Sequence, residues 1–415
     1  MDYIINDLSP ERAVLVGVDT GEFDIESSFD ELEELAETAG AKVVARFSQK
    51  RARPDTATYI GQGRLAELKS ICEADDIELL IFDCELSPSL QRNIETRTDV
   101  RVIDRTILIL DIFAAHAMSG EGKLQVEIAQ LKYMLPRLGG KGTSLSRLGG
   151  GIGTRGPGET KLESDRRHIR RRIKSLEGEL SNLKKRRELL RERRRKNGVF
   201  TVAIVGYTNA GKSTLMNALT SAGVLTMDKL FVTLDPTSRS LALPSGRNVM
   251  LVDTVGLIRR LPHHLVEAFL STLEVAAAAD VILNVCDASS DECVEHLRVT
   301  DELLDRLGCA QKPVISVLNK CDLVAGIADL PVIGKSVMIS ALTGKGLDKL
   351  LLQIDKELPP TRRQAELLFP YSMLGSVARL RRDGVIHTEE FREDGIYVRV
   401  TAEISLLDSF KHFFL

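Results

Sequence analysis

One short run limits what this chain can fold into more than any other: Gly-Tyr-Thr-Asn-Ala-Gly-Lys-Ser at residues 206–213. It follows an apolar stretch at 199–205 and precedes helix-forming residues at 214–219. A strand, a glycine-rich loop and a helix in this order are typical of a phosphate-binding loop. The glycines let backbone N–H groups surround phosphate oxygens, and the helix N-terminus adds a positive dipole end. The run therefore predicts an α/β domain that binds a nucleotide.

Each residue of the loop has an expected role. Lys212 is expected to reach the β- and γ-phosphates as a catalytic group, and the Ser213 hydroxyl to ligate Mg²⁺. The predicted phosphate-contacting residues are Gly206, Tyr207, Thr208, Asn209, Ala210, Gly211, Lys212, Ser213 and Thr214.

Two later stretches predict which base is bound. Asn319-Lys320-Cys321-Asp322 follows an apolar strand candidate at 313–318. A carboxylate at Asp322 can accept hydrogen bonds from the N1–H and 2-amino groups of guanine, and adenine lacks both donors. Asn319 is expected to tie this loop to the phosphate loop. Ser340-Ala341, at the end of a short strand within 337–342, is expected to contact the guanine O6 through its backbone.

A third stretch predicts the metal and the γ-phosphate contacts. The strand candidate at 249–252 runs into Asp253 and, three residues later, Gly256. Asp253 is expected to hold Mg²⁺ through water, and the Gly256 N–H to contact the γ-phosphate. Each stretch alone could be an ordinary strand end. All of them together, in this order, favour a GTP-binding domain at 199–360.

Composition sets the wider limits. A chain of 415 residues, 43% of them hydrophobic, can bury large cores and is expected to contain two to four domains. The six cysteines are scattered without a Cys-x-x-Cys pair, which favours reduced thiols in a cytoplasmic protein over disulfides or zinc. No apolar run approaches ~18 residues, so no membrane-spanning segment is expected.

The first 120 residues alternate strand-like and helix-like segments. This alternation predicts an N-terminal α/β domain with a small parallel sheet covered by helices. The expected strands are 14–18, 42–47, 79–83 and 100–103; the expected helices are 29–36, capped by Ser27 or Ser28, and segments around 65–68, 90–94 and 107–117. Gly61 and Gly63 could suggest a dinucleotide loop, but the third glycine and the preceding strand are missing, so a helix-start loop is favoured.

Residues 121–198 predict an antiparallel helical hairpin. Apolar residues spaced by three and four form one face on each helix. The expected positions are Leu124, Ile128, Leu131, Leu135 and Leu138 in the first helix, and Leu162, Ile169, Ile173, Leu176, Leu180 and Leu183 in the second. A glycine-rich loop at 139–158 joins them.

The hairpin is strongly basic although the whole chain carries a net charge of −3. Residues 161–196 contain 16 Lys and Arg against 6 Asp and Glu, a local excess of +10 (16 − 6). A one-signed excess beside a glycine-rich loop favours contact with RNA phosphates, while few aromatic residues argue against base stacking. The candidate RNA-binding residues are Arg147, Arg155, Arg166, Arg167, Arg170 and Arg171. The alternative is a solvated helix face next to a disordered linker.

Leu358-Pro359-Pro360 marks a boundary before a small α+β domain at 361–415. The sequence predicts a helix at 372–382, a hairpin of 385–391 and 396–400, and a helix at 406–413. This module shows no catalytic constellation, which favours a docking role.

With these residues in hand, essentially the whole chain resembles the HflX family of translation-associated GTPases. The most specific match is Gly156-Pro157-Gly158-Glu159-Thr160, followed by Leu162-Glu163 and Asp165-Arg166-Arg167. Tyr59-Ile60-Gly61 and the segment 231–237 match as well, and the latter implies that Thr233 of the first switch ligates Mg²⁺ and closes over the γ-phosphate. The resemblance further implies binding to the large ribosomal subunit and its rRNA, splitting or rescue of stalled ribosomes, and GTP hydrolysis stimulated by the ribosome.

The chain departs from the family pattern at Leu257, where Phe is usual, and at Leu342, where Lys is more common after Ser340-Ala341. In Ras-like enzymes the residue after the second-switch glycine is a Gln that orients the attacking water. Leu257 cannot do so, so slow intrinsic hydrolysis is expected. A K⁺ held near Asn209, which resembles the loop Asn of potassium-activated GTPases, is one candidate for the missing charge; the alternative is that Asn209 only braces the loop.

The leading hypothesis is therefore a monomeric, ribosome-dependent GTPase. A GTP-gated protein scaffold that does not touch RNA is the alternative. An RNA-modifying enzyme is a third, but no motif for group transfer is present.

Overall fold

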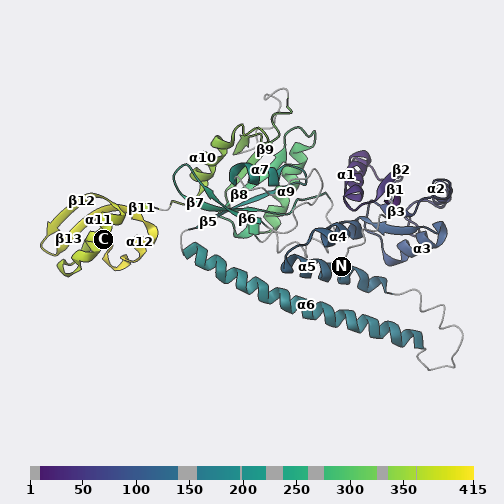
Figure 1. Ribbon diagram of the computed structural model, residues 1–415, viewed down its shortest axis with the longest axis horizontal. Helices are drawn as coiled ribbons and strands as arrows, with labels where there is room; N and C mark the ends of the chain where they lie inside the picture. The colour runs from purple at the N-terminus through teal and green to yellow at the C-terminus, as the bar shows by residue number, and fades with distance from the viewer. Residues whose placement is uncertain are drawn as a thin grey trace, which may run out of the picture.

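The computed structural model describes residues 10–138, 157–196, 199–220, 237–259, 275–324, 335–360 and 362–415. An N-terminal domain and a small C-terminal domain lie on opposite sides of a central α/β domain, and one long helix runs alongside (Figure 1). The multidomain α/β architecture expected from the sequence is confirmed.

The N-terminal domain is a parallel sheet with helices on both faces. Its strands, in the order β2-β1-β3-β4, are β1 (Arg12–Asp19), β2 (Lys42–Lys50), β3 (Leu79–Phe82) and β4 (Arg101–Asp104). Its helices are α1 (Ile25–Thr38), α2 (Gln62–Ala74), α3 (Pro88–Thr98) and α4 (Arg105–His116). Successive residues of a strand point to opposite faces. Leu15 accordingly joins the core under α1 and α4, while Val14 and Val16 join the core under α2 and α3.

Two helix starts in this domain bear on the sequence analysis. The cap expected at Ser27 or Ser28 was wrong: the Asp24 carboxylate accepts from the Glu26 N–H at 3.1 Å, because the helix begins at Ile25. The Gly61 segment is a helix-start loop, as expected, since α2 begins at the next residue.

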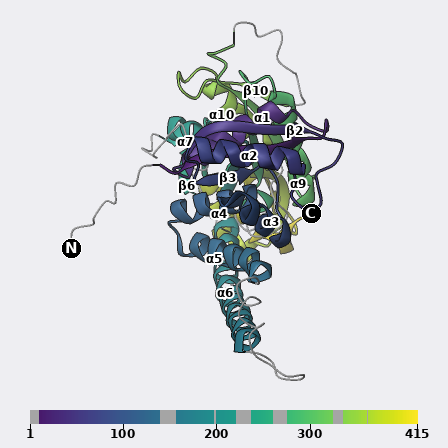
Figure 2. The ribbon, with the colours of Figure 1, turned by 90° about the vertical axis from the view of Figure 1, so that its right-hand side faces the viewer.

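The helical hairpin consists of α5 (Gly120–Met134), a short 3₁₀ turn (Leu135–Arg137) and α6 (Pro157–Lys196). Arg187 pairs with Glu121 at 3.0 Å and Arg172 with Glu127 at 2.8 Å, so the two helices run antiparallel. Ile173 and Leu176 of α6 are buried, as expected. The long helix projects from the body of the molecule (Figure 2).

The face predicted for the first hairpin helix was only partly correct. Leu124 and Leu131 are half-buried, whereas Val126, Ala129 and Tyr133 are buried in the core of the N-terminal domain. Helix α5 has two partners, α4 and α6, and a single apolar stripe cannot describe a helix that packs on two sides.

The central domain is a six-stranded sheet in the order β10-β9-β8-β5-β7-β6, in which β6 alone is antiparallel. The strands are β5 (Phe200–Gly206), β6 (Thr237–Ala242), β7 (Asn248–Asp253), β8 (Val281–Asp287), β9 (Val314–Asn319) and β10 (Ser336–Met338). The helices with described bounds are α7 (Lys212–Thr220), α9 (Cys293–Arg306) and α10 (Leu347–Glu357). The parallel strands end along one edge, where open α/β sheets bind their ligands.

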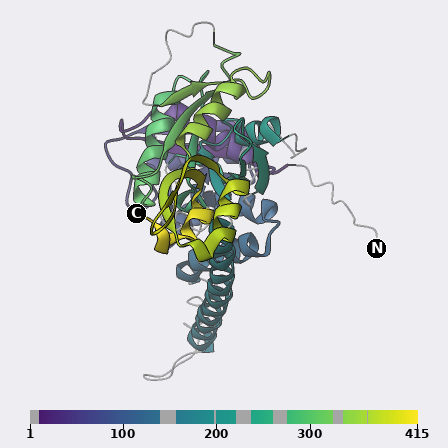
Figure 3. The same cartoon turned by 90° about the vertical axis from the view of Figure 1, so that its left-hand side faces the viewer.

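The C-terminal domain is a three-stranded antiparallel sheet carrying α11 (Figure 3). It contains β11 (Arg362–Phe369), α11 (Leu374–Asp383), β12 (Val385–Arg392), β13 (Gly395–Glu403) and α12 (Ile404–Asp408), with 3₁₀ turns at Tyr371–Met373 and Lys411–Phe413. The sequence analysis did not anticipate β11, and the expected last helix is a short α12 and a 3₁₀ turn. Across the parts of the chain that the structure describes, no helix is long and apolar enough to cross a membrane.

Candidate nucleotide-binding site

The phosphate-binding loop connects the end of β5 to the start of α7, at the carboxyl edge of the sheet. Gly211 has a φ of +86°, and a Cβ there would lie 2.3 Å from Asn319 Nδ2. Only glycine fits this position, both for its backbone conformation and for the close approach of the neighbouring loop. The loop is therefore shaped by its own sequence and by the base-side loop together.

Lys212 lies inside the loop, 7% exposed, and its Nζ donates to the Tyr207 carbonyl at 2.6 Å. Burial lowers the pKa of Lys212 to about 8, and Asp253 opposes this shift. The ammonium lies inside the loop, at the start of α7.

Two of the three expected Mg²⁺ donors, Ser213 and Asp253, lie next to each other. The Ser213 hydroxyl donates to Asp253 Oδ2 at 2.8 Å, with Asp253 fully buried at the end of β7. A hydroxyl and a carboxylate are the hard oxygen donors that Mg²⁺ prefers, so this pair fits the ion. Thr233, the expected third donor and catalytic group, lies outside the described residues.

The base-side loop is joined to the phosphate loop through Asn319. Its Nδ2 donates to the Ala210 carbonyl at 2.9 Å, and its Oδ1 accepts from the Ala341 N–H at 2.9 Å. One buried amide thus holds the phosphate loop, the base-side loop and the Ser340-Ala341 segment in one arrangement. Asp322 is exposed at the surface of its loop.

The base-side loop is held by an ion pair, and a hollow lies beside the Ser340-Ala341 segment. The Lys320 ammonium pairs with Asp287 at 2.7 Å, which keeps the loop against the end of β8. A hollow of 430 Å³ lies between α7 and the segment after β10, and its lining includes Thr214, Ala341 and Leu342. Leu342 is 81% exposed.

Gly256 and Leu257 lie directly against the phosphate loop. A Cβ on Gly256 would come within 2.6 Å of Thr208 Cγ2, so a larger residue would push the two segments apart. The Leu257 N–H donates to the Gly206 carbonyl at 3.0 Å, and its carbonyl accepts from the Thr208 N–H at 2.8 Å. The Leu257 side chain is buried against Tyr207 and cannot orient water.

The sequence analysis missed the partner of Tyr207. The Tyr207 hydroxyl donates to Glu31 Oε2 of helix α1 at 2.5 Å, and its ring stacks on His296 with centroids 3.8 Å apart. The only sequence signal was a large aromatic residue in a loop that needs small ones. It did not indicate a partner 176 residues away.

The hairpin arginines divide into two groups. Arg166 donates to the Leu138 carbonyl at 3.0 Å and is partly committed to the hairpin itself. Arg167, Arg170 and Arg171 are exposed on α6. Arg147 and Arg155 lie outside the described residues.

This sheet order, the phosphate loop and the Asn319-centred base-side loop define a P-loop GTP-binding protein. Family models match as "GTP-binding GTPase N-terminal" over residues 26–114, "GTP-binding GTPase Middle Region" over 116–194 and "50S ribosome-binding GTPase" over 201–320. The protein named GTPase HflX from Caldanaerobacter subterraneus is 50% identical over 405 residues, covering 98% of this chain and 94% of that protein.

The GTPase HflX of Escherichia coli is 39% identical over 393 residues, 93% of this chain and 92% of its own length. A crystal structure of a GTP-binding protein from Sulfolobus solfataricus in complex with GDP is 29% identical, covers 83% of this chain and 98% of its own, and has a TM-score of 0.44. The chain belongs to the HflX family and is a GTPase.

Proposed function

We propose that this GTPase is a switch that acts on the large ribosomal subunit and splits or rescues stalled ribosomes, with hydrolysis stimulated by the subunit. The observation that carries the proposal is the exposed basic group Arg167, Arg170 and Arg171 on α6, a helix that projects beyond the nucleotide-binding domain (Figure 2). Such a group suits rRNA phosphates.

The residues of the nucleotide site support the chemistry of this switch. Lys212 neutralises the β- and γ-phosphates, Ser213 and Asp253 provide oxygen donors for Mg²⁺, and the Gly256 N–H, beside the loop, contacts the γ-phosphate once Gly256 moves toward it. Bound Mg²⁺ supplies charge neutralisation between the phosphates. Asp322 reads guanine, and Asn319 holds the two loops in register.

The decisive experiment compares GTP hydrolysis by the full chain alone, with large ribosomal subunits and with small subunits. Leu257 offers no water-positioning group, so we expect slow hydrolysis alone and a clear increase with large subunits only. Equal rates in all three conditions would contradict the proposal and favour the scaffold that does not touch RNA.

A monovalent cation is the proposed source of further positive charge. Asn209 sits in the loop with a φ of +58°, a conformation that Asn tolerates and that turns the loop sharply at this residue. If Asn209 helps hold K⁺ near the β- and γ-phosphates, hydrolysis is faster in KCl than in NaCl at equal ionic strength, and Asn209→Ala abolishes the difference. Equal rates in the two salts would leave Asn209 with a bracing role only.

A further inference from the structure

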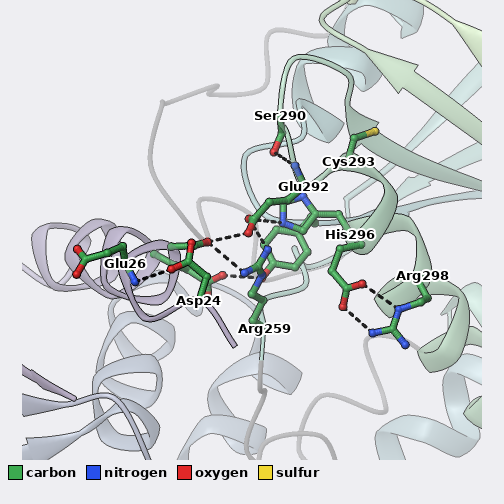
Figure 4. Close-up of polar contacts among 12 residues, drawn as sticks. Asp24, Glu26, Arg259, Ser290, Glu292, Cys293, His296 and Arg298 are labelled. Atoms are coloured by element: carbon green, nitrogen blue, oxygen red, sulfur yellow. Dashed lines mark hydrogen bonds and ion pairs between the residues drawn. The ribbon is translucent and has the colours of Figure 1, made fainter. Parts of the chain in front are cut away.

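Helix α1 of the N-terminal domain touches both the phosphate-binding loop and the segment that follows Gly256. Arg259 lies between α1 and the start of α9, where its guanidinium pairs with Glu292 and donates to Ser27 Oγ at 3.1 Å (Figure 4). Val255 and Ile258 are buried, 5% and 3% exposed, in the same core cluster as residues of β1, α1 and α4. Val255, Ile258 and Arg259, on either side of Gly256 and Leu257, therefore pack against the N-terminal domain.

A hydrogen bond joins α1 to the phosphate-binding loop. Tyr207 donates to Glu31 at 2.5 Å. Burial and the neighbouring carboxylate raise the pKa of Tyr207, so the hydroxyl keeps its proton and remains the donor.

Arg105, at the first turn of α4, holds Glu31 in place. Its guanidinium pairs with Glu31 and with Asp83 at 2.8 Å, and it also donates to the Arg259 carbonyl at 3.3 Å. Burial alone would lower the pKa of Arg105, but Glu31 and Asp83 outweigh it and raise the pKa. A buried cation bound on several sides gives the Glu31 carboxylate one fixed position.

Tyr207 and its neighbours in turn restrain Leu257, the residue after Gly256. The backbone of Leu257 bonds to the residues on both sides of Tyr207, and its side chain packs against the Tyr207 ring. Gly256, whose N–H must approach a γ-phosphate, directly precedes Leu257. Any shift of Gly256 toward that phosphate therefore strains the two hydrogen bonds of Leu257 and its contact with Tyr207.

We propose that Glu31 is a positioning residue for the phosphate-binding loop: through the Tyr207 hydroxyl it holds the loop against Leu257, resists a shift of Gly256 toward a γ-phosphate, and thereby weakens GTP binding relative to GDP. By linkage, bound GTP weakens the Glu31–Tyr207 contact to the same extent. This inference is independent of the ribosomal partner, since it concerns only nucleotide binding by the full chain.

The test measures Kd for GDP and for a non-hydrolysable GTP analogue with four full-length variants: Tyr207→Phe, Glu31→Gln, the two combined, and Asp30→Asn. Tyr207→Phe keeps the ring stacked on His296 and removes only the hydroxyl. Asp30 is the matched control. It lies on the same helix and, like Glu31 and Tyr207, lines a hollow between α1 and the phosphate-binding loop, but it pairs with Arg46 at 2.8 Å.

We expect each single change at Tyr207 or Glu31 to tighten binding of the analogue relative to GDP by about fivefold or more. The combined variant should show no larger shift than Tyr207→Phe alone, because Glu31→Gln removes the charge of the acceptor in the same hydrogen bond that Tyr207→Phe removes entirely. Asp30→Asn should leave the ratio unchanged.

An unchanged ratio in Tyr207→Phe overturns the proposal, and this variant decides alone if Glu31→Gln fails to fold. Additive effects of the two changes would show that the residues act separately. A shift of equal size in Asp30→Asn would assign the effect to the negative charge around the hollow rather than to the hydrogen bond.

Discussion

The carboxylate of Asp322 lies at the surface of the loop after β9, and the buried loop residues around it have structural partners. Asn319 is bonded to two other segments, and Cys321 donates its backbone N–H to the Ile339 carbonyl at 3.1 Å. This arrangement leaves Asp322 exposed, as its proposed contact with a base requires, while its neighbours hold the loop. If Asp322 reads the base and its neighbours stabilise the loop, a change at Asp322 should alter base specificity without unfolding the loop.

The change Asp322→Asn tests that division. An amide cannot accept from both N1–H and the 2-amino group of guanine, so we expect GDP to bind roughly 10- to 100-fold more weakly, the loss of a hydrogen bond to a charged group. Xanthosine diphosphate carries a carbonyl in place of the 2-amino group. It should bind more tightly to the Asp322→Asn variant than to the unchanged chain. Calorimetric titration with both nucleotides measures this.

The matched control is Cys321→Ser, because a serine hydroxyl can still donate to the Leu318 carbonyl that Cys321 Sγ contacts at 3.2 Å. It should leave both affinities unchanged. If Asp322→Asn binds GDP as tightly as the unchanged chain does, Asp322 does not read the base.

At this scale the sequence predicted contacts within the nucleotide-binding motifs and missed those between domains. The Asn319 bridge followed from a motif whose spacing encodes the loop. The Glu31–Tyr207 hydrogen bond could not be predicted in this way, because it depends on how the N-terminal domain packs against the central domain. The spacing of apolar residues within each domain does not indicate that packing.

Among the elements, α6 carries the proposed RNA contact. Its apolar residues Ile173 and Leu176 are buried, and Arg172 and Arg187 pair with α5. Arg170 and Arg171 are exposed. The structure therefore separates basic residues that join the two helices from basic residues that could meet phosphates.

We expect the double change of Arg170 and Arg171 to Gln to weaken binding to large ribosomal subunits. Each phosphate contact contributes roughly one unit to the slope of log Kd against log salt, so the slope should fall by about two. The control is the same change at Lys349 and Lys356, exposed lysines on α10. Binding measured by pelleting at several salt concentrations compares them, and equal slopes would remove these arginines from the interface.

The prediction of helices and strands was most reliable where the pattern of apolar residues fitted only one of the two. The four parallel strands of the N-terminal sheet were expected because short apolar runs alternate with helical segments. Strand β11 was not, since Arg362–Phe369 contains Gln, Ala, Glu and Leu, which favour helices as much as strands. Its strand form depends on pairing with β13, a partner far along the chain.

On the scale of the whole molecule, the N-terminal and central domains share a core cluster, whereas the C-terminal domain has its own. Val255 and Ile258 lie in the N-terminal core cluster. Among the described residues, the C-terminal core cluster contains residues from 365–414, with Phe369, Leu380 and Val398 fully buried. The first two domains are thus expected to respond to nucleotide together, and the third independently.

A chain that ends at residue 360 tests this independence. Leu358, the last apolar residue of the central core, is retained, and so is the Pro359 carbonyl that accepts from Arg247 at 3.0 Å. We therefore expect GDP affinity within about twofold of the full chain, well inside the 1.4 kcal/mol that a tenfold change represents. Heating monitored by circular dichroism should lose one unfolding transition and keep the others at the same temperature. If GDP affinity falls by more than tenfold while the remaining transitions are unchanged, the C-terminal domain contributes to the nucleotide site despite its separate core, because a folded central domain would then lack something that only residues 361–415 supply.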